Sequence, residues 1–136
     1  MESVNRSTAG LYGTGWFVTD PKELADKILS LDKNIRYVGI LDETEFKILE
    51  SRMQNGLESF TANQDDRWLI ELFSPIIMGA AQRLEKDVGR IAYSVVRYEK
   101  VTLVVARIQG YLVTLSVHPS ITVRPLYERI KKSLHE

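Results

Sequence analysis

The sequence contains no cysteine. Disulfides, thiolate nucleophiles and thiolate metal sites are therefore excluded, and with them the disulfide-rich secreted scaffolds. The 18 basic residues are matched by 18 acidic ones, so the chain lacks the basic excess typical of nucleic-acid-binding proteins. No apolar run approaches the roughly 20 residues of a membrane-spanning helix, and the first residues do not read as a secretory signal. We expect a soluble, cytoplasmic protein that neither binds nucleic acid nor inserts into a membrane.

The length of 136 residues suits one domain, and the hydrophobic share of 44% is ordinary for a globular protein. Residues 1–19 are rich in Ser, Thr, Asn and Gly, which predicts a flexible N-terminal arm. Tyr12, Trp16 and Phe17 are unusual in a mere tail, so this arm either covers its own core or docks on a partner. We place a single domain at residues 20–136.

Sequence signals for the start of a helix occur near both ends of this domain. A helix over about 21–32 has Asp20 as a cap and Pro21 in its first turn. The closing helix has Thr122 as a cap and Pro125 in its first turn. In both segments the apolar residues recur at helical spacing and form one buried face.

Five segments between these helices have the composition of β-strands. A hairpin is predicted at residues 35–41 and 46–53, around the polar turn Asp42-Glu43-Thr44-Glu45. Three further strands are predicted at about 90–98, 101–108 and 111–118, with tight turns at Glu99-Lys100 and Gln109-Gly110. Alternation makes one face of these three strands nearly all apolar, with Ile91, Tyr93 and Val95 on it. The other face is mixed but still largely apolar, so the sheet must be covered on both faces.

The longest helix is predicted at about 65–88, capped by Asp65 or Asp66 and ended by Gly89. Pro75 falls inside it and predicts a kink or a short break. Its apolar residues cover more than one stripe, so it needs burial on two sides. One side faces the sheet, and the other needs a second layer or a second subunit.

The element order α-β-β-α-β-β-β-α over residues 20–136 resembles that of the roadblock/dynein-light-chain family. "IRYVGILDE" is similar to the family's first strand, and "VGRIAYSVVR" opens a similar three-strand meander. The family's glycine-rich turn is replaced here by "DETEF". A looser similarity is to archaeal proteins of this general type. The resemblance implies an α+β sandwich. In it, the long helix covers one face of a five-stranded antiparallel sheet, and the terminal helices cover the other.

The same resemblance implies a function. Members form homodimers or heterodimers, in which two sheets join through the middle strand and two long helices pack side by side. Such dimers serve as platforms for small GTPases, motor subunits or signalling complexes. We therefore expect a non-enzymatic, dimeric scaffold or regulatory module, with a small GTPase among its partners. The predicted dimer interface consists of Trp68, Leu72, Phe73, Ile77, Ala81, Ile91, Tyr93 and Val95.

Nothing in the sequence predicts a catalytic, cofactor or metal site. We expect no local Ser or Cys to pair with His118 or His135, and two histidines without a third spaced ligand do not indicate a metal. The acidic stretches "DETE" and "EKD" are read as a solvated turn and a helix face. Arg124 and Arg129 in the closing helix are read as an ordinary basic helix end rather than a phosphate site.

Two alternatives stay open. A small-molecule sensor of the profilin-like or PAS-like kind would enclose a ligand between sheet and helix, and Trp68, Phe73 and Met78 are candidate lining residues. A PAS-like domain has several short helices where this sequence predicts one long helix, and this difference weighs against the sensor alternative. An enzyme is the third reading, without a nucleophile, metal site or phosphate loop to support it.

Overall fold

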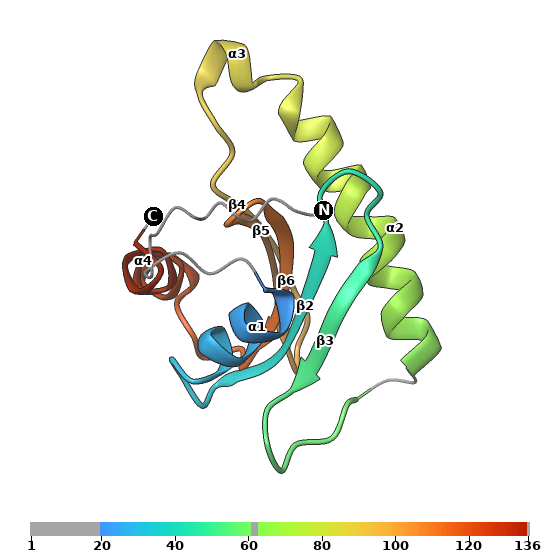
Figure 1. The fold of residues 1–136 in the computed structure, drawn as a ribbon, viewed down its shortest axis with the longest axis vertical. Helices are drawn as coiled ribbons and strands as arrows, with labels where there is room; N and C mark the ends of the chain where they lie inside the picture. Colours follow the sequence, from blue (N-terminus) through green and yellow to red (C-terminus); the bar gives the residue numbers. More distant parts are fainter. Residues whose placement is uncertain (1–19, 61–62, 136) are drawn as a thin grey trace.

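The computed structural model describes residues 20–60 and 63–135, with the side chains of 63–66 and 68 left out. The predicted N-terminal arm lies outside the described residues. The order is α1 (Pro21–Leu29), β2 (Ile35–Asp42), β3 (Ile48–Met53), α2 (Asn63–Gln82), α3 (Glu85–Val88), β4 (Tyr93–Arg97), β5 (Thr102–Ile108), β6 (Tyr111–Val117) and α4 (Val123–Ser133) (Figure 1). This order confirms the predicted α+β class.

The five strands form one antiparallel sheet in the order β3-β2-β6-β5-β4. Ile108 pairs with Tyr111 and Val104 with Leu115, which is the register that the predicted two-residue turn Gln109-Gly110 requires. Gln109 and Gly110 both have positive φ, at 53° and 81°, as a two-residue hairpin turn requires. β3 and β4 form the two edges of this sheet.

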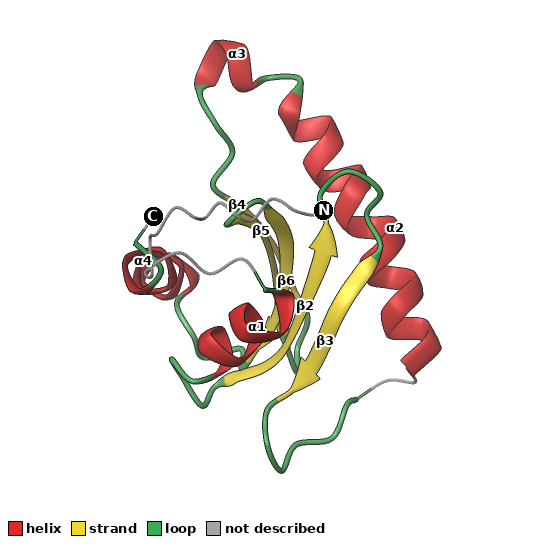
Figure 2. Ribbon diagram, in the orientation of Figure 1, coloured by secondary structure: helices red, strands yellow, loops and turns green. Residues whose placement is uncertain are grey.

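Helices cover both faces of the sheet, as predicted. α1 and α4 lie on one face and α2 on the other, while α3 lies beyond the end of the sheet at the top of Figure 2. The core under α1 and α4 is the larger one and includes Leu24, Ile28, Val113, Leu126 and Ile130. The core under α2 contains Leu41, Ile70, Met78, Val105 and Leu112.

Local chemistry explains how several elements begin and end. Asp20 caps α1, because its Oδ1 accepts a hydrogen bond of 3.1 Å from the Lys22 N–H. Asp42 shapes the first hairpin turn, since its carboxylate accepts from the N–H groups of Thr44 and Glu45 at 3.1 and 3.2 Å. Thr122 occupies the N-cap position of α4 without a side-chain hydrogen bond.

Three local predictions were wrong. α2 begins at Asn63, so Asp65 and Asp66 lie inside the helix rather than at its cap. α2 stops at Gln82 rather than at residue 88, and the short α3 follows after Arg83 and Leu84. The helix has no break at Pro75, which was one of the two outcomes expected there. Ile91 precedes β4 and packs against the core under α2, whereas Tyr93 packs against the core under α4.

Candidate functional site

α2 is held to the sheet along one narrow side. Ile70, Ser74 and Met78 recur every four residues and are buried against the strands. The Ser74 hydroxyl lies 3.2 Å from the Thr114 hydroxyl of β6. Near the first turns of α2, the Glu71 Oε2 accepts a hydrogen bond of 3.1 Å from the Ile48 N–H of β3. These contacts fix which side of α2 faces outward.

The outward side of α2 is also apolar. Leu72 and Ile76 lie two residues from Ile70 and Ser74, which places them on the opposite side of the helix. Their exposed fractions are 46% and 59%. Beyond the helix end, Leu84 and Val88 are exposed by 59% and 79%. We call Leu72, Ile76, Leu84 and Val88 the outer stripe.

β4 forms one free edge of the sheet, and its Val95 points to the α1/α4 face, because it pairs with Val104 of that core. β4 pairs only with β5 among the described strands, so the backbone groups on its other side have no partner strand there. Val95 of β4 is exposed. Tyr93 is half-buried, because its ring centroid lies 5.0 Å from that of Tyr127 in α4.

The predicted interface residues therefore differ in their surroundings. Leu72 and Val95 are exposed, and the side chain of Trp68 lies outside the described part. The remaining five are half-buried: Phe73, Ile77, Ala81, Ile91 and Tyr93. Ile76, Leu84 and Val88 are exposed but were not among the predicted interface residues, although the helical spacing from Leu72 to Ile76 is visible in the sequence.

A cavity of about 570 Å³ lies between the sheet and the first turns of α2. Its floor comes from β2, β5 and β6, and its roof from Leu69 and Ile70. The Ser59–Phe60 end of the loop after β3 and the turn between β4 and β5 close its sides. Phe73 and Met78, predicted to line such a pocket, are not among the lining residues, and Met78 is buried in the core instead.

The mouth of the cavity carries two cations beside one aromatic ring. The Arg36 guanidinium carbon lies 4.3 Å from the centroid of the Phe60 ring, and the Lys100 Nζ lies 5.8 Å from it. Arg36 Nη2 also donates a hydrogen bond of 3.0 Å to the Glu58 carbonyl. Among the described residues, no carboxylate forms an ion pair with either cation, although Glu99 lines the same cavity.

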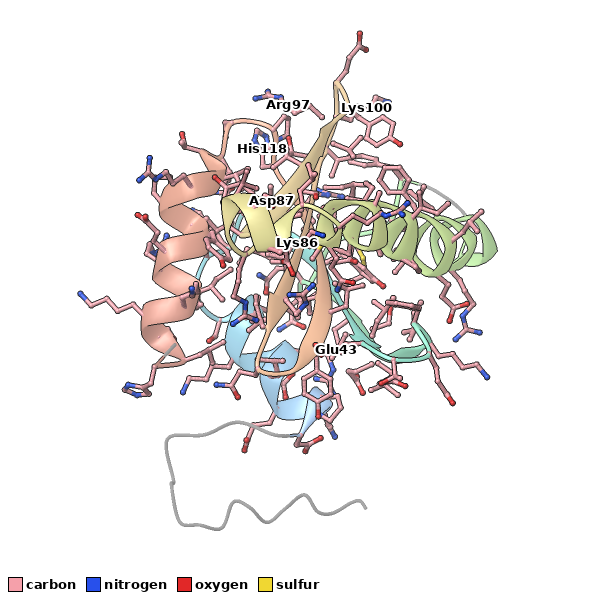
Figure 3. All side chains as sticks on the ribbon, turned by 90° about the horizontal axis from the view of Figure 1, so that it is seen from above. Glu43, Lys86, Asp87, Arg97, Lys100 and His118 are labelled. Carbon is pink, nitrogen blue, oxygen red and sulfur yellow. The ribbon has the colours of Figure 1, made fainter. Side chains whose placement is uncertain are left out.

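The side chains that could suggest catalysis have structural roles. His118 Nδ1 lies 2.8 Å from the Ser120 hydroxyl and accepts from the Ser120 N–H at 3.1 Å. In Figure 3, His118 and Arg97 lie on the α4 side of the β4–β5 hairpin, away from Lys100. Arg97 Nη2 donates to the Pro119 carbonyl at 3.3 Å. The expectation that no local Ser pairs with His118 was therefore wrong, and the contacts of His118 with both the hydroxyl and the N–H of Ser120 stabilise the turn after β6.

The basic residues of α4 pair locally. Arg129 Nη1 donates to the Asp32 carboxylate at 3.2 Å, and its Nη2 donates to the Leu31 carbonyl at 2.6 Å. The hydrogen bond from the Asn34 N–H to Asp32 Oδ1 is the main cause that lowers the pKa of Asp32, and Arg129 adds to it. Arg124 pairs with Glu128 at 3.5 Å. α4 is thus fastened to the end of α1.

The acidic segment Glu85-Lys86-Asp87 also has a structural role. Glu85 of α3 accepts from the Ile91 N–H at 2.9 Å and lies 3.6 Å from Arg107 Nη1. Within residues 20–60 and 63–135, no group of three His, Asp or Glu side chains is placed to hold a metal ion. No described helix has both the length and the apolar character needed to cross a membrane.

No protein-family model matches the sequence, and the curated proteins give no significant match. Solved structures do share the fold. The gliding protein MglB of Thermus thermophilus is 16% identical, with a TM-score of 0.61 over 87% of this chain and 91% of its own. MglB of Myxococcus xanthus is 17% identical, with a TM-score of 0.61 over 86% and 93%. A roadblock/LC7 domain from Streptomyces avermitilis is 11% identical, with a TM-score of 0.62 over 86% and 93%. The resemblance to the roadblock family is thereby confirmed at the level of the fold.

Proposed function

We propose that this chain is a non-enzymatic, roadblock-like module that forms a homodimer and uses it as a platform for a partner protein. The small GTPases are the partner class that the resemblance implies. The observation that supports the proposal is the exposed outer stripe on α2 and α3. Soluble monomers rarely expose contiguous apolar patches of this kind unless the patch binds something.

The dimer would use two features of the chain, the free edge of β4 and the outer stripe. The free edge of β4 can pair with a second β4, which satisfies backbone groups that an exposed edge leaves open. The outer stripe would then pack against its copy across a two-fold axis. Gly79 and Ala80 lie exposed beside Ile76, and their small side chains allow two helices to approach closely.

We keep the interface predicted from the sequence as a proposal, but with different residues at its centre. Leu72 stays at its middle because it is exposed, and Ile76 joins it. Val95 is exposed too, but it points to the α1/α4 face of the sheet, so it would contribute only along the β4 edge. Ile77 and Ala81 are half-buried and would contribute only at its border. A substitution at Ile77 would test the fold as well as the interface, so Ile76 is the better site for a charge.

Light scattering coupled to size-exclusion chromatography tests the dimer over a dilution series. The wild type is expected at twice 15.6 kDa. Ile76→Glu is expected to be a folded monomer, because each dimer would bury two unpaired carboxylates. Leu49→Glu is the matched control, since Leu49 is 49% exposed on the opposite edge strand and should leave the dimer intact. A wild-type monomer at every concentration would reject the proposal, as would a dimer that Ile76→Glu leaves unchanged.

The comparisons support self-assembly and a regulatory use over catalysis. One similar structure, 16% identical with a TM-score of 0.61, is described as MglB with a tetrameric arrangement, and another as a gliding protein. A cytoplasmic location and the absence of an enzymatic activity belong to this proposal and not to the fold. Whether the chain comes from an archaeon stays a prediction that none of these structures tests.

The GTPase part has its own test. Purified small GTPases, loaded with GDP or with a non-hydrolysable GTP analogue, would be titrated against the wild-type dimer by biolayer interferometry. We expect one nucleotide state to bind and the Ile76→Glu monomer to bind more weakly. Equal binding of both nucleotide states would reject the proposed regulatory interaction with a small GTPase, but it would not affect the proposal that the chain forms a dimer.

A further inference from the structure

We propose that the cavity under the first turns of α2 binds an amphiphilic organic anion with a flat aromatic body and one anionic head group. The proposal does not depend on the dimer, because the cavity lies between α2 and the sheet, whereas the outer stripe faces away from the sheet. It assigns a specific binding site to the small-molecule sensor that the sequence left open as an alternative function.

The size and the walls of the cavity fit an apolar body. About 570 Å³ falls within the range of roughly 300–1,000 Å³ typical of small-molecule sites. Leu69 and Ile70 form the roof, and Met53, Val101 and Leu103 line the sides and floor. An apolar ligand there would replace water against five aliphatic or thioether side chains.

The floor holds a few polar groups at fixed positions. The Tyr37 hydroxyl accepts a hydrogen bond of 2.9 Å from Ser51, and the Thr114 hydroxyl pairs with Ser74. Gly39 leaves room for the Tyr37 ring, since a Cβ at Gly39 would lie 2.7 Å from the Tyr37 hydroxyl oxygen. The ring therefore lies along the sheet as part of the floor and presents an aromatic surface to a flat ligand.

The mouth fits an anionic head. Arg36 and Lys100 both lie at the Phe60 ring, 4.3 and 5.8 Å from its centroid, so two positive charges lie at this end of the cavity. Arg36 has five N–H donors, and its hydrogen bond to the Glu58 carbonyl engages one nitrogen only. Glu99 offsets one of the two charges in the lining, so a ligand with a single negative charge balances the site. Exposed Phe60 can stack on the aromatic body beside that head.

The test uses two fluorescent probes that differ by one charged group. 8-Anilinonaphthalene-1-sulfonate and its uncharged parent N-phenyl-1-naphthylamine have the same aromatic body. Each would be titrated into the full-length wild type and into Arg36→Met/Lys100→Met. We expect the sulfonate to bind about tenfold more tightly than the parent in the wild type, equivalent to one charge-assisted contact. The double variant should lose this preference and keep its affinity for the uncharged probe.

Two further variants separate the cavity from general effects. Arg124→Met/Lys132→Met removes the same two charges from exposed positions on α4, and it should keep the tenfold preference. Leu103→Trp fills the floor of the cavity and should weaken the binding of both probes. Circular dichroism would confirm that each variant is folded.

Three outcomes would overturn the proposal. Equal affinity for the two probes in the wild type would mean that the mouth does not select an anion. Loss of sulfonate binding in Ile76→Glu would assign the probe to the outer stripe. Binding that tightens more than tenfold in Trp16→Ala/Phe17→Ala would mean that the N-terminal segment is the natural occupant.

Discussion

The hydrogen bond between Ser74 and Thr114 provides a direct test of how α2 is attached to the sheet. Both residues are almost fully buried, with exposed fractions of 1% and 2%, and their hydroxyl oxygens lie 3.2 Å apart. Removing one hydroxyl leaves the other buried without its partner. Such a loss costs about 1–3 kcal/mol, whereas removing both groups can be nearly neutral.

The expected magnitudes follow from this asymmetry. Thr114→Val should destabilise the protein by about 1–2 kcal/mol. Ser74→Ala should cost only about 1 kcal/mol, because alanine is the better helix former by a few tenths of a kcal/mol and offsets part of the loss. The double variant should cost less than the sum of the two, with a coupling of about 1 kcal/mol.

Urea unfolding followed by circular dichroism would measure the four proteins of this cycle at one fixed concentration, because self-association shifts apparent stability. Ser133→Ala, at a half-buried position on α4, is the control and should stay within about 0.5 kcal/mol of the wild type. Additive single effects, or two singles both within that margin, would refute the reasoning. α2 would then not be packed on β6 through this pair.

Three further perturbations have defined outcomes. Glu85→Ala should destabilise the protein by about 1–3 kcal/mol in urea unfolding, because it leaves half-buried Arg107 without its carboxylate; no change would mean that α3 is not held by this pair. Asp32→Asn should destabilise the protein at pH 7. Since the folded pKa of Asp32 lies below its ordinary value of 3.8, its contribution is full above pH 3.8 and is lost as the pH falls through the folded pKa. The difference from the wild type should therefore shrink in unfolding experiments below pH 3.8, and a constant difference would contradict this. Gly39→Ala should displace the Tyr37 ring and weaken binding of the uncharged naphthylamine probe, and unchanged affinity would show that the ring does not shape the floor.

The element order could be read from the sequence because each element carries its own local signals. Asp20 and Pro21 mark the start of α1, and Gln109-Gly110 marks a two-residue turn whose φ angles the structure confirms. The start of α2 could not be placed in this way. Asp65 and Asp66 are good capping residues, but the helix already begins at Asn63, so several polar residues in a row offered more than one possible start.

The cavity could not be predicted because its parts are distant in sequence. Arg36, Phe60 and Lys100 come from a strand, a loop and a turn, and no periodic pattern connects them. The exposed Phe60 in an otherwise polar loop was the one local signal available. The outer stripe was partly predictable, since an over-apolar helix indicates burial on two sides, but the sequence did not show which residues face the strands.

The two sides of α2 bear on the choice between a dimer module and a ligand sensor. A helix that only covered a ligand cavity would need polar residues on its outward side, yet Leu72 and Ile76 are there and exposed. A helix that served only as a dimer surface would be expected to pack closely on its own sheet, because interiors are filled to near crystal density. Among the described residues, a cavity of about 570 Å³ lies beneath its first turns instead. Neither reading accounts for both sides of the helix, so the proposed assembly through the outward side of α2 and the proposed anion site under its inward side are complementary proposals rather than competing ones.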